Sequence, residues 1–260
     1  MCPDAVDIES TSTPPQEPNS SLRAKVLSNR RLTAMGEVTL CSGFPTQLSL
    51  GLLLQLAGIE TINSNGQLSL FYLVTLSLID ATLILSLVWL LLRLRGESIE
   101  VTLLGTRPVA REMQLGLLLV PGAFLIIAVV FTVTSNFAPV LHNVLENPLE
   151  AMITSPTTAI VFAGVAMIAG GLREEVQRAF IQHRFEQHLG GAVTGLVVFS
   201  IVFGLGHSLQ GWDAAIATGL LGVLWGVLYL VRRSVVAPVT CHAVFNMAEV
   251  LIAYSGNTAT

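Results

Sequence analysis

The sequence predicts an all-α protein, a polytopic transmembrane helical bundle of about seven spans with its N-terminus inside. The first observation is composition: of 260 residues, 52% are hydrophobic and only 12% are charged, and the mean hydropathy is +0.71. A soluble domain is about 25% charged. The other two observations are a series of long apolar segments and the distribution of basic residues between them.

A helix needs about 20 apolar residues to cross a hydrocarbon core about 30 Å thick. Seven segments approach this length, and the first of them is the shortest. They cover residues 44–60, 68–92, 113–134, 157–180, 192–210, 213–231 and 235–254. We group the first three as N-terminal transmembrane helices (44–134) and the last four as a transmembrane core (157–254).

The basic residues gather before the first span and in alternate connections. They are Arg23, Lys25, Arg30 and Arg31 before the first span; Arg93, Arg95, Arg107 and Arg111 after the second; Arg173, Arg178 and Arg184 at the end of the fourth; and Arg232 and Arg233 after the sixth. Because Lys and Arg concentrate in cytoplasmic loops, this alternation predicts a cytoplasmic N-terminus, seven crossings and an external C-terminus.

Residues 1–43 precede the first span and differ in composition from the rest of the chain. The stretch "MCPDAVDIESTSTPPQEPNSS" is acidic, rich in Ser, Thr and Pro, and has almost nothing to bury. We expect residues 1–43 to form a disordered, polar cytoplasmic tail. A signal peptide would begin with basic residues and become apolar at once.

Ionisable residues inside the spans are candidates for function, because a charge at the bilayer centre costs at least about 2.5–3.5 kcal/mol. They are Asp80, Glu174, Glu175, Arg178, His207, His242 and Glu249. Asp80 stands alone in its span, and we favour a neutral or locally hydrogen-bonded acid in a helix interface. Glu249 lies near the end of the last span and could equally reach the membrane surface or line a site.

The adjacent glutamates follow a run without charge that begins at Ala151. Glu174 and Arg178 are four residues apart on one helical face, and Glu175 is three residues before Arg178. A structural ion pair with Arg178 explains one of the two glutamates, but it does not explain why a second glutamate lies next to it. Two neighbouring carboxylates in a low dielectric do not both ionise easily. The pair therefore indicates a functional site.

Two histidines and an amide can join these glutamates. His242 and Asn246 are four residues apart on one helical face. If the fourth and fifth spans form a hairpin that turns near residues 190–191, Glu174 and His207 lie level with each other. Helical rise then places the site between the cytoplasmic face and the midplane of the membrane.

Three short motifs on these spans resemble one known family. "EEVQRA" (174–179), "FGLGH" (203–207) and "HAVFN" (242–246) are similar to the EExxxR, FxxxH and HxxxN motifs of the CPBP intramembrane proteases. That family includes type II CAAX prenyl endopeptidases, Abi proteins and lysostaphin resistance protein A-like proteins. The resemblance covers about residues 157–254 and implies an all-helical catalytic core around a water-filled cavity.

The resemblance implies a role for each motif residue. Glu174 resembles the general base that activates water, with His207 assisting it, and Glu175 matches the second glutamate. His242 and Asn246 resemble the pair that stabilises the oxyanion, while Phe203 is a supporting residue. Amide hydrolysis needs an activated water, a proton carrier and donors aimed at the oxyanion.

The arginine of the first motif departs from the family pattern. Many relatives read "EExxFRG", which places Ala179 at the arginine position and Arg178 at the phenylalanine position. One residue is a rotation of about 100° around a helix. We therefore do not transfer the role of the family's arginine, and we keep Arg178 as structural support because of its own spacing to the glutamates.

Metal dependence is left open by the sequence. There is no HExxH motif, although Glu174, His207 and His242 could form a three-ligand open zinc site. We favour hydrolysis without a metal, because Asn246 suits oxyanion stabilisation better than zinc ligation. We expect no cofactor, with zinc as the alternative.

The predicted protein is thus an intramembrane endopeptidase that cleaves membrane-associated or prenylated (CAAX-type) substrates by glutamate-activated water. Its expected partners are the lipid bilayer and a membrane-associated peptide or protein, with no nucleic acid. We expect it in the bacterial inner (cytoplasmic) membrane. One alternative is a non-catalytic scaffold or immunity protein of the same fold. Another is a small proton-coupled transporter.

Overall fold

The chain is all-helical over the residues that the computed structural model describes, 20–64, 66–144 and 147–259. Its α-helices are α1 (Ser20–Cys41), α2 (Phe44–Leu56), α3 (Leu70–Leu94), α4 (Val109–Phe137), α5 (Pro156–Val165), α6 (Glu174–His188), α7 (Ala192–Leu205), α8 (Trp212–Arg232) and α9 (Val236–Ala259). Two π-helices, η1 (Glu100–Leu104) and η4 (Ala166–Arg173), and three short 3₁₀-helices, η2 (Pro139–Leu141), η3 (Glu150–Met152) and η5 (Ser208–Gln210), complete it. The predicted helical bundle is confirmed.

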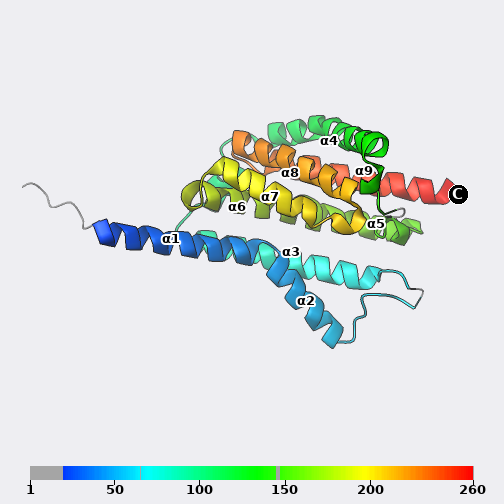
Figure 1. Cartoon of the computed structure of the whole chain (residues 1–260), viewed down its shortest axis with the longest axis horizontal. Helices are drawn as coiled ribbons and strands as arrows, with labels where there is room; N and C mark the ends of the chain where they lie inside the picture. The colour runs from blue at the N-terminus through cyan, green and yellow to red at the C-terminus, as the bar shows by residue number, and fades with distance from the viewer. Residues whose placement is uncertain (1–19, 65, 145–146, 260) are drawn as a thin grey trace, which may run out of the picture.

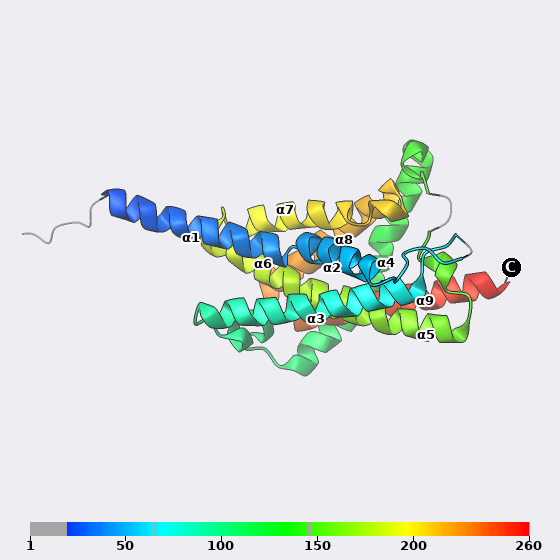
Figure 2. The same ribbon diagram turned by 90° about the horizontal axis from the view of Figure 1, so that it is seen from below.

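The helices follow the long axis of the molecule, and α4 is inclined to the others (Figure 2). In Figure 1, α1, α2 and α3 lie on one side of α6 and α7, and α4 lies on the other side. The segment α5–η4–α6 passes through the middle, where η4 packs against both α3 and α9. Helix α1 begins at one end of the molecule, and α9 finishes at the other (Figure 1).

Among residues 20–64, 66–144 and 147–259, four helical segments are long and apolar enough to cross a membrane. They are Leu70–Leu94, Glu100–Phe137, Trp212–Arg232 and Val236–Gly256. The other three predicted spans differ for separate reasons: α2 has only 13 residues, α7 has 14, and the π-helix η4 divides the fourth span into α5 and α6. The protein is an integral membrane protein, while seven full crossings and a cytoplasmic N-terminus stay predictions.

The tail prediction is wrong for residues 20–41, which form the helix α1. Residues 1–19 of the predicted tail lie outside the described residues. The part of α1 next to the bundle packs against α6, and Ala34 and Cys41 on it are fully buried. Tertiary packing stabilises a helix that composition alone does not support.

The connections that carry arginines meet at one end of the bundle. The ion pairs that join them are Arg95–Glu37 (2.8 Å), Arg184–Glu97 (2.8 Å) and Arg233–Glu186 (2.5 Å). They link α1, the α3–η1 connection, α6 and the α8–α9 turn. We call this the arginine end, and it agrees with the alternation of basic residues in the sequence.

The hairpin of α6 and α7 turns where the sequence predicts it. Gly190 and Gly191 have φ values of +106° and +97°, which residues with a side chain rarely adopt. Beyond the turn, Gly195 of α7 lies directly against Phe185 of α6. The absence of a side chain lets the two helices approach closely, and this sets the register that brings Glu174 and His207 to one cavity.

Candidate active site

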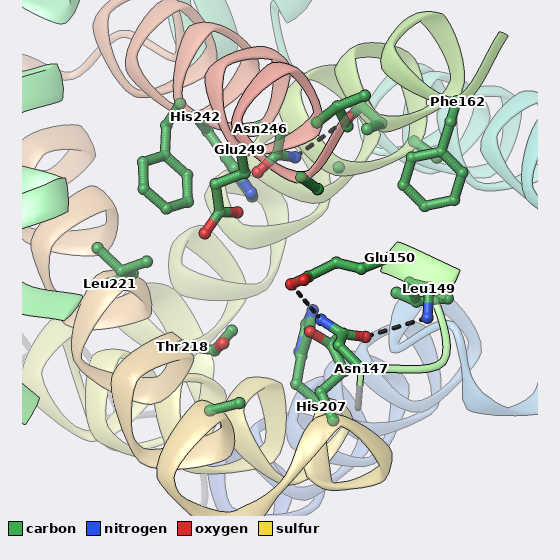
Figure 3. Close-up of a pocket in the computed structure, with 18 of the residues that line it drawn as sticks. Asn147, Leu149, Glu150, Phe162, His207, Thr218, Leu221, His242, Asn246 and Glu249 are labelled. Atoms are coloured by element: carbon green, nitrogen blue, oxygen red, sulfur yellow. Dashed lines mark hydrogen bonds between the residues drawn. The ribbon is translucent and has the colours of Figure 1, made fainter. Parts of the chain in front are cut away.

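A cavity of about 310 Å³ lies between the helices of the core (Figure 3). Its walls are mostly apolar, and its polar lining residues are Ser77, Asn147, Glu150, Glu174, His207, Gln210, Thr218, His242, Asn246 and Glu249. Four predicted site residues therefore share this cavity: Glu174, His207, His242 and Asn246. The fifth, Glu175, and the supporting Arg178 lie buried behind the wall. A concave apolar site with a few polar groups is the usual form of a ligand site.

Two glycines of η4 let α9 approach the glutamates. A side chain at Gly171 would meet Ala243 of α9 at 2.6 Å, and one at Gly170 would collide with the amide of Asn246. The helix is wound as a π-helix over these glycines and returns to α-helix at Glu174. π-helical turns occur often at functional sites because they redirect the following side chains.

Glu175 orients His242. The carboxylate of Glu175 accepts a hydrogen bond of 2.8 Å from Nδ1 of His242, and its other partner is the guanidinium of Arg178. The imidazole also stacks on Trp225, with ring centroids 3.6 Å apart. Because Nδ1 donates to Glu175, Nε2 is the nitrogen that His242 turns toward Glu174.

Arg178 pairs with Glu175 rather than with Glu174. Its side chain is fully buried, and its Cζ atom lies 4.6 Å from the ring centre of Phe203 and 5.5 Å from that of Trp225. A guanidinium over aromatic faces is stabilised by cation–π attraction. Ala179, which occupies the position of the arginine in many relatives, is also fully buried. The shifted arginine thus supports the second glutamate from below the cavity wall.

Glu174 is the carboxylate left without a close partner. Its side chain is 18% exposed and faces the cavity. The nearest charged groups are Nη1 of Arg173 at 3.9 Å and Nε2 of His242 at 4.0 Å, and both exceed hydrogen-bonding distance. Within the described residues it accepts no hydrogen bond. A carboxylate with free lone pairs beside an oriented imidazole can bind and deprotonate water.

His207 lies across the cavity from His242, Asn246 and Glu249 (Figure 3). Its Nδ1 donates to the carbonyl oxygen of Phe203 at 2.9 Å, because a carbonyl can only accept. The tautomer therefore leaves the lone pair of His207 on Nε2. Phe203 also packs edge-on against the imidazole, with centroids 4.9 Å apart. This supports the role assigned to Phe203, although no contact joins His207 to Glu174 in the part of the chain described.

Asn246 lies one turn after His242 on α9 and lines the cavity. One hydrogen of its Nδ2 amide is donated to the carbonyl oxygen of Ala166 at 3.1 Å. Ala166 begins the π-helix η4, so the amide also ties α9 to η4. The second amide hydrogen stays available to a group in the cavity.

Sequence reasoning left two further acidic residues undecided. Glu249 lines the cavity, as Glu150 does (Figure 3). Its position seven residues after His242 on the same helical face could have predicted this. Asp80 lies in a helix interface, as interpreted, but it forms a buried ion pair with Arg173 rather than standing alone.

The site lies away from the arginine end along α6. Glu174 is 14 residues before the end of α6 at His188, about 21 Å at 1.5 Å per residue. The cavity continues away from the arginine end to Asn147 and Glu150, in the connection between α4 and α5. The position of the site between the cytoplasmic face and the midplane of the membrane stays a prediction.

The predicted zinc ligands do not fit a metal ion in this arrangement. Two ligand atoms of one tetrahedral zinc ion, each about 2.0–2.2 Å from it, lie about 3.4 Å apart, whereas those of Glu174 and His242 are 4.0 Å apart and His207 lies on the facing wall. Across the described ranges, no three His, Cys, Asp or Glu residues form a group that could hold a metal. We derive no chemical step through a metal.

These features define an integral membrane protein with an ionisable site enclosed by its helices. Comparison with known families then gives a match for residues 156–248 to the family described as type II CAAX prenyl endopeptidase Rce1-like. No curated protein matches the chain, and no solved structure matches it. The resemblance of the three motifs to the CPBP family is thus supported by this match over residues 156–248.

Proposed function

We propose that the protein is an intramembrane endopeptidase that hydrolyses peptide bonds of membrane-associated or prenylated substrates. The observation that carries the proposal is the contrast between the two glutamates. Glu175 is buried and engaged by Arg178 and His242, whereas Glu174 faces the cavity without a close partner. Only Glu174 is free to act on water.

In the proposed reaction, Glu174 accepts a proton from water while the water oxygen attacks the scissile carbonyl carbon. The carbonyl oxygen then becomes an oxyanion. The free amide hydrogen of Asn246 can donate to it, and His242 can donate from Nε2 when its imidazole carries both protons. Glu175 holds the imidazole in the orientation that this requires. Protonation of the leaving amine, with the proton taken from Glu174, completes cleavage.

His207 has a different position from the one expected of an assistant to Glu174. Its Nε2 carries a lone pair and lies across the cavity. We infer that a substrate peptide lies between the two walls, where His207 can accept a hydrogen bond from its backbone or from the attacking water. Apolar walls suit the apolar side chains of a substrate that enters from the membrane.

The test is Glu174→Gln, which keeps the size of the side chain but cannot accept a proton from water. We expect turnover of a membrane-tethered peptide to fall by at least about 10²–10⁴-fold, the usual contribution of a general base. Because Glu174 makes no ion pair closer than 3.9 Å, folded yield in detergent should not change. Normal turnover by well-folded Glu174→Gln protein would end the protease proposal in favour of a scaffold or transporter.

Metal dependence has its own test. His207 lies on the wall opposite His242 (Figure 3), which favours hydrolysis without zinc, so active protein should keep its turnover after dialysis against a chelator. The metal content of the purified protein is measured in parallel. Loss of activity with the chelator, restored by zinc alone, would place Glu174, His207 and His242 in ligand roles.

A further inference from the structure

Asp80 is a buried acid on α3 that lies outside the family-matched segment. Its side chain is 3% exposed and forms an ion pair with Nη2 of Arg173. Two residues of α2 add hydrogen bonds to the same carboxylate, from the hydroxyl of Thr46 and from Nε2 of Gln47 at 3.3 Å. Three donors, two on α2 and one on η4, therefore fix this carboxylate in place.

Arg173 stands between Asp80 and Glu174. It is the last residue of η4, and Glu174 is the first residue of α6. Neighbouring residues on a helix point about 100° apart, so Arg173 is directed to α3 while Glu174 faces the cavity. The guanidinium nevertheless stays near both acids, because its Nη1 is 3.9 Å from Oε1 of Glu174.

The surroundings hold Arg173 toward α3. Gly43, in the break between α1 and α2, has a φ of +86°, and a side chain there would meet Nη2 of Arg173 at 2.6 Å. One turn later, Gln177 donates to the carbonyl oxygen of Cys41 at 2.6 Å. The α1–α2 break, which lies beside α6 in Figure 2, is thus fitted to this face of the helix.

We propose that Asp80 is a positioning residue for catalysis, which holds Arg173 away from Glu174 and keeps the catalytic carboxylate free to accept a proton. This rests on the proposed role of Glu174 as the general base. Without Asp80, the buried guanidinium has Glu174 as its nearest remaining acid. A charge-assisted hydrogen bond between them would occupy the lone pairs that must bind water. The N-terminal helices would thereby contribute directly to the site.

The experiment compares Asp80→Asn with the double variant Asp80→Asn/Arg173→Gln. Each is purified in detergent, and kcat and KM on a membrane-tethered peptide are expressed per folded protein. Asp80→Asn should lower kcat by about tenfold or more with an unchanged KM, a loss in keeping with an impaired general base. The double variant should recover to within about threefold of wild type, because the competing cation is gone.

The ion pair of Glu112 and Arg232 is the matched control. It also joins two membrane helices, α4 and α8, and its carboxylate is fully buried. Neither residue lines the cavity. Glu112→Gln should lower stability and leave kcat within about twofold of wild type, because breaking a buried pair costs stability wherever it lies.

Three results would overturn the proposal. One is an unchanged kcat in folded Asp80→Asn protein, and another is a folded double variant as slow as the single variant. If Asp80→Asn does not fold, a slow double variant alone decides against the role. The third is normal turnover by Glu174→Gln, which also removes the proposed function. With Glu174→Gln inactive, either of the first two results contradicts the positioning role alone.

Discussion

The two halves of α6 contain the same residue types and use them differently. In the half toward the arginine end, Arg184 donates to Glu37 at 2.5 Å and to Glu97 at 2.8 Å, so each of these carboxylates has a close cation. In the half that begins the helix, Arg178 neutralises Glu175 only, and Glu174 is left facing a cavity. The first arrangement fastens connections together, whereas the second keeps one base unpaired.

The difference shows that ion pairs alone do not separate a structural site from a catalytic one. Both regions bury a guanidinium against carboxylates and aromatic rings: Arg184 lies 4.6 Å from the ring of Phe180, as Arg178 does from that of Phe203. What distinguishes the half at the proposed site is a carboxylate in excess of the cations, Glu174, which lies beside the imidazole of His242.

The largest expected effect is that of Glu175→Gln, on both stability and turnover. Glu175→Gln leaves Arg178 buried without a counter-charge, so we expect a loss of about 3–5 kcal/mol in the free energy of unfolding. The protein that still folds should also lose turnover, because His242 is no longer fixed by a carboxylate. Glu37→Gln removes the equivalent acid at the arginine end and should lower stability only. Equal losses of turnover per folded protein in the two variants would contradict the division between the halves.

Gly170→Ala should separate activity from stability. Alanine favours a helix by about 1 kcal/mol over glycine, but the added Cβ would displace the amide of Asn246. We expect turnover to fall, at most by the roughly 10²–10³-fold lost when an oxyanion donor is removed, without a loss of folded protein. Gly164→Ala is the control, because nothing lies within 4 Å of its added Cβ. An active Gly170→Ala variant would argue against a role for Asn246 at the oxyanion.

The smallest expected effect is on the melting temperature at low pH, through Glu97 at the arginine end. Burial raises the pKa of Glu97, but hydrogen bonds and charges from Arg184 and His183 outweigh it and hold the pKa below the ordinary value of 4.5. A carboxyl with a depressed folded-state pKa stabilises the protein above its unfolded-state pKa, and the stabilisation is lost as pH falls through the folded-state value. Melting temperature should therefore fall below about pH 4.5, and less steeply in Glu97→Gln. Parallel pH curves for the two proteins would show that this ion pair contributes nothing.

Much of the candidate site could be predicted from local spacing. His242 and Asn246 share a helical face, and the turn at residues 190–191 places Glu174 and His207 at the same cavity. The choice of glutamate that binds Arg178 could not be predicted, because i,i+3 and i,i+4 pairs are both allowed on a regular helix. It depends on tertiary contacts, because the rings of Phe203 and Trp225 lie beside the guanidinium of Arg178.

The sequence by itself determined the class of this protein: a helical membrane bundle whose rare charges mark a site. Hydropathy and helical periodicity are local properties, so they can be determined from the sequence without knowledge of the fold. Only the tertiary structure decided that α1 is a helix, that Asp80 meets Arg173, and that Glu249 faces the cavity. Each depends on a contact between segments distant in the chain. Close approach at glycines such as Gly171 makes these contacts possible, because backbones can meet only where no side chain intervenes.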